Sequence, residues 1–235
     1  MQVHIIHAQS EADSFVTAMR NVIAERFEAG GATVSHSDLY AMGFNPVLSP
    51  ADFGERKDSA HLTYALEQRH GFETGSLAPD ILREIEHVLA ADILVFTFPL
   101  FWFSVPAILK GWIDRVFISG PFYGGRRIYG QGGLAGKRAM AAFSLGGREA
   151  MFGPHHLHGQ LERGMLRHFL QGALGYVGLA VLEPFVAYHV PYLDISARAD
   201  LLERLADYVD RLDDMPVMAM PDLAQFGPDF SPLAR

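Results

Sequence analysis

Short apolar segments alternate with segments of helical periodicity along most of the chain. The apolar segments that read as strands are residues 3–8, 33–37, 93–98, 138–143 and 181–187. Between them, apolar residues recur every three or four positions, which is typical of helices with one buried face. Strands that alternate with helices indicate a parallel sheet covered on both faces. The sequence therefore predicts a doubly wound α/β fold with five parallel strands.

Helices are expected between these strands. The segments with helical periodicity are residues 15–27, 81–89, 107–117, 158–176 and 196–212. Ser10 and Asp13 both suit the N-cap of the first helix, and Gly30-Gly31 suits its end. Residues 42–76 lack a clear period, so they are expected to form an irregular insert that walls a pocket.

Strands in this sequential arrangement suggest a flavodoxin-like sheet, in which ligands bind beyond the carboxyl ends of the first and third strands. Three loops should meet there: residues 9–15, 99–103 and 144–147. The second loop carries the run Phe-Pro-Leu-Phe-Trp-Phe at residues 98–103. Aromatic faces stack on flat ring systems, and the N–H groups of a tight turn can face ring heteroatoms. This run predicts a flavin site.

Composition narrows the class of protein. The chain has 235 residues, of which 49% are apolar and 20% charged, so one domain with a large core is expected. A net charge of −8 argues against nucleic acid or an anionic membrane as the main partner. Cysteine is absent, which excludes disulfides and thiolate metal sites. Without a signal-peptide pattern or a long apolar run, a cytoplasmic protein with no membrane insertion is expected.

Several smaller features have two interpretations. No G-x-G-x-x-G or Walker pattern is present, which argues against a nicotinamide-type Rossmann site or a nucleoside triphosphatase. Ser10 and Ser14 could bind a phosphate near a helix N-terminus or simply cap the helix. Trp102 could be a ring platform or a core residue. The pair Arg126-Arg127 could attract the phosphates of NAD(P)H or be a solvated surface pair.

Histidines at 155, 156 and 158 lie close together in one loop. Two or three imidazoles could ligate zinc, but no nearby carboxylate or thiolate completes a familiar spacing. Histidines in such a loop are more often solvated or hydrogen-bonded to the backbone. No metal is therefore expected.

Seven segments together resemble the NAD(P)H:quinone acceptor oxidoreductases, the DT-diaphorase family. They are residues 38–42, 44–46, 98–100, 102–103, 105–112, 115–118 and 181–184. The resemblance runs from the first strand to about Leu212, and the chain after about 215 matches only loosely. We therefore expect a single flavodoxin-like domain, residues 1–235, with a C-terminal extension from about 215.

The resemblance implies a function and an assembly. It implies a homodimer with one FAD in each active site, built at the subunit interface. NAD(P)H would reduce the flavin by hydride transfer and leave, and a quinone would then take both electrons at once in a ping-pong reaction.

The resemblance also implies roles for particular residues. His158 matches the catalytic histidine of the family. The substrate pocket would include Tyr123, lent by the neighbouring subunit, with Gly125 and Phe152. The residues expected at the cofactor are Gln9, Ser14, Phe15, Pro99, Leu100, Phe101, Trp102, Phe103, Ser144, Leu145, Gly146, Gly147 and Arg198.

Several of these positions depart from the family pattern. Phe152 replaces a tyrosine that pairs with the histidine, and a phenyl ring can neither donate a hydrogen bond nor release a proton. His158 would then compensate the charge of the reduced flavin alone, so slower flavin reduction is expected. Gly125 replaces an aromatic residue and should open one wall of the pocket.

Other departures leave the cofactor open between FAD and FMN. Gln9 replaces a histidine, Val16 an asparagine, Phe101 a glutamine and Leu145 a threonine. The first two positions lie where the pyrophosphate and adenosine of FAD would bind, and FMN needs only one phosphate site.

Two further functions remain alternatives: a regulatory flavoprotein subunit of a potassium-efflux system, and an FMN-dependent azo or nitro reductase. A one-electron flavodoxin carrier is disfavoured by the insert at 42–76 and by the aromatic run. The sequence does not distinguish NADH from NADPH, and the acceptor is expected only to be a small quinone-like molecule.

Overall fold

The computed structural model describes residues 1–233, in which parallel strands form one sheet. The strands are β1 (Gln2–His7), β2 (Thr33–Asp38), β3 (Ile93–Pro99), β4 (Arg138–Ser144), β5 (Ala180–Val181) and β6 (Phe185–Ala187). Their order is β2-β1-β3-β4-β5, and β6 also pairs with β4. The predicted doubly wound parallel sheet is confirmed, and strand order reverses between β1 and β3 as the flavodoxin-like prediction requires.

The predicted fifth strand differs from the structure. Residues 181–187 form parts of two short strands, β5 and β6, both paired with β4. At the break, the N–H of Glu183 donates to the carbonyl of Pro216 in the C-terminal segment, 2.9 Å away, instead of to β4. Pro184 has no N–H to donate. The sheet therefore has six strands, not five.

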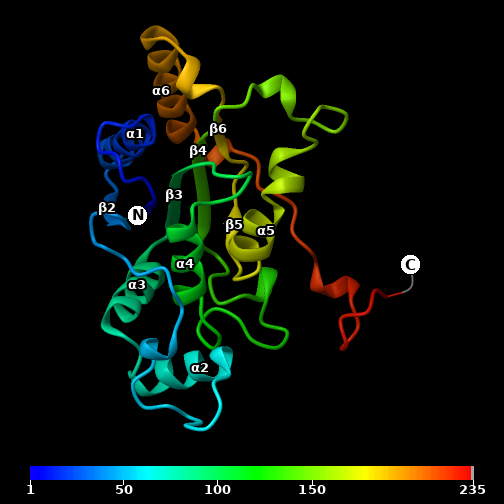
Figure 1. Cartoon of the computed structure of the whole chain (residues 1–235). Coiled ribbons are helices and arrows are strands. Elements are labelled where there is room, and N and C mark those ends of the chain that lie inside the picture. Colours follow the sequence, from blue (N-terminus) through cyan, green and yellow to red (C-terminus); the bar gives the residue numbers. More distant parts are fainter. Residues whose placement is uncertain (234–235) are drawn as a thin grey trace.

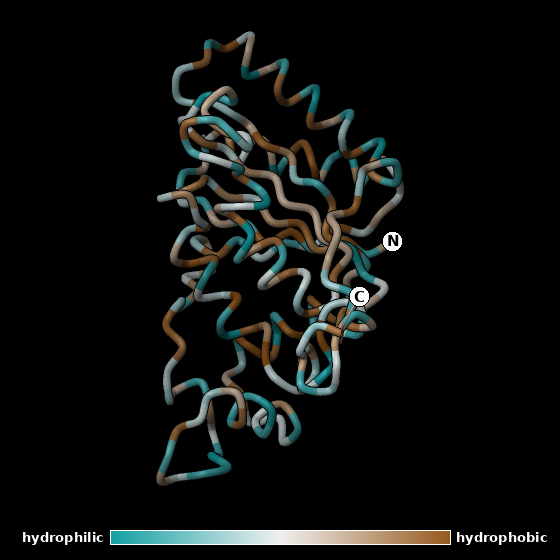
Figure 2. The backbone as a smooth tube through the Cα atoms, turned by 90° about the vertical axis from the view of Figure 1, so that its right-hand side faces the viewer, coloured by the Kyte–Doolittle hydropathy of each residue, from teal (hydrophilic) through white to brown (hydrophobic). Residues whose placement is uncertain are grey.

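Helices cover both faces of the sheet (Figure 1). They are α1 (Phe15–Ala29), α2 (Tyr64–Thr74), α3 (Pro79–Ala90), α4 (Ala107–Val116), α5 (Arg167–Phe169) and α6 (Ile195–Asp210). α1 and α6 pack together on one face, in a core that includes Ile5, Met19 and Leu205. α3, α4 and the segment around α5 pack on the other face, in a core that includes Phe96 and Trp112. Figure 2 shows the hydrophobic residues concentrated in the strands between these layers.

Three helix predictions need correction. The first helix is capped by Ser14, not by Ser10 or Asp13, because the Ser14 hydroxyl accepts from the N–H of Thr17 at 3.1 Å. The predicted helix over 158–176 is a short α5 between two π-helical segments, Leu161–Met165 and Leu170–Gly175. Its interior glycines lower helix propensity. The insert contains α2, which periodicity did not reveal because polar residues, Glu67 and Gln68, occupy its buried face.

A buried arginine fixes the insert on α4. Arg115 is 3% exposed and donates to the carboxylates of Asp52, at 2.8 Å, and Asp80, at 2.6 Å. It also donates to the carbonyl of Asn45 at 3.0 Å. Buried ions of opposite charge hold their positions because separating them would leave a charge unpaired in a medium of low polarity. This cluster, the Arg115 network, holds the insert in place.

The C-terminal segment crosses the edge of the sheet and then reaches the loop after α4. The N–H of Met218 donates to the carbonyl of Val181 at 2.8 Å, and Met218 is buried. Further on, Arg126 donates to the carbonyls of Gly227 and Leu223 at 2.5 and 3.1 Å. Within residues 1–233, no helix has the length and apolar character needed to cross a membrane.

Candidate active site

The carboxyl ends of four strands meet at one edge of the sheet. The N–H of Leu100, after β3, donates to the carbonyl of Ser144 at 2.8 Å, and the N–H of Leu145 donates to Ala187, at the end of β6, at 3.0 Å. The N–H of Ala8, after β1, donates to Thr97 at 2.9 Å. The three loops predicted to converge therefore do so, joined by the loop after β6. We call this region the carboxyl edge.

The aromatic run forms a tight turn at the carboxyl edge. Phe101 and Ser104 exchange two backbone hydrogen bonds, of 3.0 and 2.9 Å, and the two residues between them have φ of 49° (Trp102) and 57° (Phe103). Side-chain-bearing residues adopt this left-handed conformation at a cost of about 1–3 kcal/mol each, and such strain clusters at ligand sites. Trp102 is 96% exposed, so its ring is not a core residue. We call residues 101–104 the aromatic turn.

His158 lies against the aromatic turn. Its ring centroid is 5.2 Å from that of Phe103 and 5.3 Å from that of Phe152. Phe152 is buried and also contacts Tyr188, with 5.9 Å between centroids. Burial, followed by the nearby carboxylates of Glu162 and Glu149, raises the pKa of Tyr188 to about 12. Phe152 therefore fills the space beneath His158 with an apolar ring.

A histidine that sequence reasoning missed holds the glycine turn after β4. The backbone N–H of His189 donates to the carbonyl of Gly147 at 2.9 Å, and its ring nitrogen Nδ1 lies 3.0 Å from the carbonyl of Gly146. His189 itself has a φ of 60°. A Cβ on Gly147 would lie 3.0 Å from the Phe152 ring, whereas one on Gly146 would have no neighbour closer than 3.9 Å. Gly147 is needed for packing, and Gly146 leaves its face open to a ligand.

The loop after β1 has a buried histidine beneath it. His7 Nδ1 lies 2.7 Å from Thr97 Oγ1 and Nε2 lies 3.3 Å from Thr17 Oγ1. Burial, and then the charge of Arg20, lowers the pKa of His7 to about 4, so the ring is neutral near pH 7. In the loop above, the Gln9 side chain accepts from the N–H of Glu11 at 3.1 Å.

The remaining residues predicted near FAD are in this loop, at the start of α1 and in α6. A cavity of about 500 Å³ is lined by Gln9, Ser10 and Arg20, among others. Phe15 is half-buried at the start of α1. Arg198 is in the first turns of α6, and its Nε is buried without a hydrogen-bond partner among residues 1–233. An orphaned buried donor at this place suits an anionic or carbonyl group of a ligand.

Tyr123 and Gly125 do not join His158 within one chain. Phe122 accepts from the N–H of Gly133 at 2.7 Å, close to the amino end of β4, and Figure 1 shows this loop at the opposite end of the strands from residues 145–160. Tyr123 contacts Tyr176, with 5.5 Å between ring centroids, and burial raises its pKa. Gly125 has a φ of 56° and no neighbour within 4 Å of a built Cβ. We call this region the distal end.

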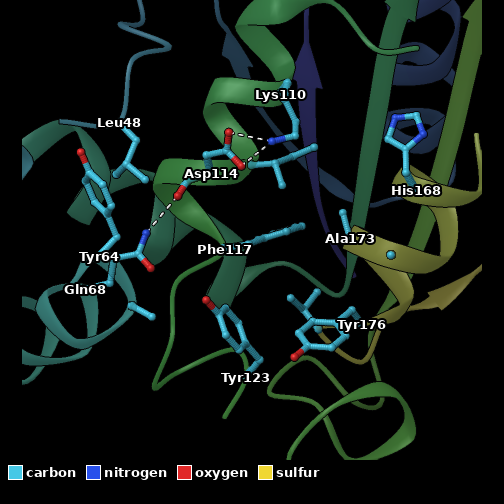
Figure 3. Close-up of a pocket in the computed structure, with 14 residues that line it drawn as sticks. Leu48, Tyr64, Gln68, Lys110, Asp114, Phe117, Tyr123, His168, Ala173 and Tyr176 are labelled. Carbon is cyan, nitrogen blue, oxygen red and sulfur yellow. Dashed lines mark hydrogen bonds and ion pairs between the residues drawn. The ribbon is translucent and has the colours of Figure 1, made fainter. Parts of the chain in front are cut away.

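A cavity of about 470 Å³ leads from the distal end toward the aromatic turn. Figure 3 shows Tyr123 and Tyr176 at one end of it and Lys110 and His168 at the other. His168 Nδ1 donates to the carbonyl of Met165 at 2.9 Å, and Nε2 lies 3.0 Å from the Ser104 hydroxyl. No sequence pattern pointed to His168, whereas His189 follows a strand whose carboxyl end could have been placed at the site.

The clustered histidines form no ligand set in the described part of the chain. Across residues 1–233, no three His, Asp or Glu side chains gather closely enough to hold a metal ion. His155 and His156 are exposed, while His158 is turned against the aromatic rings.

Comparison with known proteins places the chain in a family. A family model described as "Flavodoxin-like fold" matches residues 1–212. NAD(P)H dehydrogenase [quinone] 1 of Rattus norvegicus is 38% identical over 85% of this chain and 73% of its own length. Ribosyldihydronicotinamide dehydrogenase [quinone] of Mus musculus is 34% identical over 90% of both chains. The chain belongs to this quinone dehydrogenase family. It is therefore an oxidoreductase, and the resemblance inferred from sequence is confirmed.

Solved structures agree with this assignment. A structure from Klebsiella pneumoniae superposes with a TM-score of 0.88 at 34% identity, over 92% of this chain and 86% of that one. The NAD(P)H:quinone oxidoreductase of Methanothermobacter marburgensis superposes with a TM-score of 0.71 at 27% identity, over 91% and 96% of the two chains.

Proposed function

We propose that this protein is a flavin-dependent oxidoreductase that moves two electrons from NAD(P)H to a small quinone-like acceptor. The observation that carries the proposal is the aromatic turn: two left-handed aromatic residues at the carboxyl edge, with His158 against one of them. Such strain is retained where it serves binding, and the carboxyl ends of β1 and β3 are where this fold binds ligands.

The residues at the carboxyl edge fit a flavin ring. Trp102 offers an exposed face, and the backbone N–H groups of Trp102 and Phe103 have no acceptor among residues 1–233. The open face of Gly146 allows close approach of a ring edge. The flavin, when bound, supplies the hydride chemistry itself.

FAD is the cofactor we propose, and FMN is the alternative. The orphaned Nε of Arg198 offers a donor beyond the ring site, which the longer dinucleotide can use. Val16 is only 2% exposed and packs in the interior, so its side chain is not available to either cofactor. The substitution at this position therefore does not count against FAD.

The protein's own groups position the reactants and balance charge. The rings of Trp102 and Phe103 exclude water from one side of the site. The His158 ring packs against Phe103 of the turn, and an imidazole there can stabilise developing negative charge. Phe152 beside it adds no donor.

We also propose that two copies of the chain complete each site. Tyr123 and Gly125 lie at the distal end, away from His158 of the same chain. A homodimer that sets the distal end of one subunit against the carboxyl edge of the other would bring Tyr123 to the acceptor. Sedimentation of the holoprotein as a monomer at working concentration would contradict this arrangement.

The decisive experiment identifies the chromophore and tests its reduction. The purified holoprotein is denatured, the released flavin is identified by mass, and a second sample is mixed anaerobically with NADH or NADPH. We expect FAD whose absorbance bleaches and returns on addition of a quinone. Release of FMN would show that the cofactor is FMN and not FAD. A flavin that neither nucleotide reduces would favour the regulatory subunit of a potassium-efflux system.

The substitution Phe152→Tyr tests the missing hydroxyl. The new phenol would lie beside His158 and could share a proton with it, so we expect faster flavin reduction in stopped-flow measurements. Phe230→Tyr, which adds the same group on an exposed ring of the C-terminal segment, should leave the rate unchanged. An unchanged rate in Phe152→Tyr would show that the hydroxyl is irrelevant in this chain.

A further inference from the structure

The two arginines that are adjacent in sequence have different surroundings. Arg126 is engaged by the C-terminal segment: it donates to the carbonyls of Gly227 and Leu223, and its guanidinium carbon lies 5.2 Å from the Phe230 ring centroid. Arg127 instead lines a cavity of about 580 Å³ together with Arg69 of α2. The relevant cationic pair is therefore Arg69 and Arg127, which are far apart in sequence. We call this cavity the arginine pocket.

Both arginines donate hydrogen bonds to the segment Ser119-Gly120. Arg127 Nη1 donates to the carbonyl of Gly120 at 2.5 Å, and Arg69 Nη2 donates to Ser119 Oγ at 3.0 Å. Gly120 has a φ of 105°, which favours glycine, and a Cβ there would lie 3.2 Å from Arg69 Cγ. A Cβ on Gly124 would lie 3.1 Å from Arg69 Nη2. The absence of side chains at these two glycines lets Arg69 lie across the loop beside Arg127.

The charges of the two arginines are not neutralised within the described chain. Neither Arg69 nor Arg127 forms an ion pair with another residue of 1–233, and each has only one side-chain hydrogen bond to the protein. Glu73 also lines the pocket but is not within ion-pair distance of either. Two neighbouring guanidinium groups repel each other, and in a protein of net charge −8 such a pair is a local exception. An anion bound between them would relieve the repulsion.

The shape of the pocket suits a phosphate attached to a larger group. Its volume of about 580 Å³ exceeds that of one phosphate, and Phe72 and Tyr123 contribute aromatic walls. Guanidinium groups present several N–H donors to phosphate oxygens. Tyr123 also lines the cavity of Figure 3, so the arginine pocket adjoins the region that we propose faces the acceptor.

We propose that Arg69 and Arg127 bind a phosphate group of the pyridine nucleotide. The identity of the ligand as a pyridine nucleotide rests on the proposed function, whereas the binding of an anion by the two arginines does not. NADH and NADPH share a pyrophosphate, and NADPH carries an additional 2′-phosphate monoester. Binding of the monoester would make the enzyme prefer NADPH, whereas binding of the pyrophosphate would lower the KM for both nucleotides.

The kinetic test uses Arg69→Gln and Arg127→Gln in the holoprotein. Each change removes one charged hydrogen-bond donor group, so we expect KM to rise about tenfold or more while kcat is nearly kept. A rise for NADPH alone identifies the 2′-phosphate, and an equal rise for both identifies the pyrophosphate. The control is Arg211→Gln, which removes the same charge at the far end of α6. An unchanged KM for both nucleotides in both variants would overturn the proposal.

A binding test separates this inference from the proposed function. Calorimetric titration with adenosine 2′,5′-bisphosphate and with AMP needs no turnover. We expect weaker binding of at least the bisphosphate in Arg69→Gln and Arg127→Gln, and no change in Arg211→Gln. If the wild-type protein reduces quinones but all four proteins bind both probes equally, the phosphate site is wrong and the function stands. If arginine-dependent binding is found in a protein that reduces no quinone, the site stands and the function fails.

Discussion

The carboxyl edge and the distal end are fixed by different physical means. At the carboxyl edge, Trp102, Phe103 and His189 adopt left-handed backbone conformations, and aromatic rings remain exposed. Toward the distal end, the insert is held on α4 by the buried charges of the Arg115 network. The first region keeps strained backbone in a conformation that a ligand can use, while ion pairing keeps the second region in place without a ligand. The two should therefore respond differently to substitution and to acid.

The largest expected effect is on stability, from loss of the Arg115 network. Arg115→Met would leave the carboxylates of Asp52 and Asp80 without their buried cation, and breaking such a pair costs about 3–5 kcal/mol. We expect that loss in the free energy of urea unfolding. Lys110→Met on the same helix removes a cation from an exposed pair with Asp114 and should cost at most about 0.5 kcal/mol. Equal losses in the two variants would show that burial does not distinguish the pairs.

Acid should destabilise the carboxyl edge before the Arg115 network. The unfolded chain protonates His7 as the pH falls through about 6.5, but the folded protein does so only near 4, so stability is lost across that interval. At pH 5 the loss amounts to about 2 kcal/mol. Burial opposes ionisation of Asp80, but the hydrogen bonds and charge of Arg115 hold its pKa below the ordinary value of 3.8. Its contribution is present above that value and is lost only as the pH falls below it.

The measurement is urea unfolding at pH 7 and pH 5. His7→Asn should lose about 2 kcal/mol less between these two values than the wild type. Asp80→Asn should change the stability at both values equally, because Asp80 remains ionised over this interval. A wild-type-like loss in His7→Asn would assign the acid sensitivity to another group, and His4, whose pKa burial lowers to about 3, is the first to test.

The sequence predicted the carboxyl edge well because that edge follows from strand order. Once the strands were located, the loops containing Trp102 and Gly146 had to meet. Periodicity failed where polar residues occupy buried positions, as Glu67 and Gln68 do in α2. Adjacency in sequence also misled: Arg126 and Arg127 read as a pair, but Arg127 shares a cavity with Arg69 of α2, while Arg126 binds the C-terminal segment. Contacts between distant segments depend on the packing of the insert, which has no local pattern.

Trp102 tests whether strain at the carboxyl edge serves binding. Trp102→Gly removes an exposed ring and permits the positive φ, so we expect the flavin-free protein to be unchanged or up to about 1 kcal/mol more stable. Flavin binding should weaken about tenfold, because stacking on one aromatic ring contributes about 0.5–1.5 kcal/mol beyond burial. Trp102→Tyr keeps the ring and the strain and should bind nearly as the wild type does. Loss of stability in Trp102→Gly would show that the ring supports the fold.

The smallest expected effect distinguishes the contribution of the His189 side chain to flavin binding from that of its backbone conformation. His189→Gly keeps the left-handed conformation but removes the hydrogen bond to Gly146, whereas asparagine tolerates that conformation and restores an N–H donor. We expect His189→Gly to weaken flavin binding about threefold to tenfold, since one such hydrogen bond contributes about 0.5–1.5 kcal/mol, and to shift the flavin absorbance. His189→Asn should recover most of both. The mechanism requires this recovery: if asparagine and glycine behave alike, the contact of the His189 ring with the tilted ring of Tyr192, with centroids 4.7 Å apart, orients the glycine turn instead.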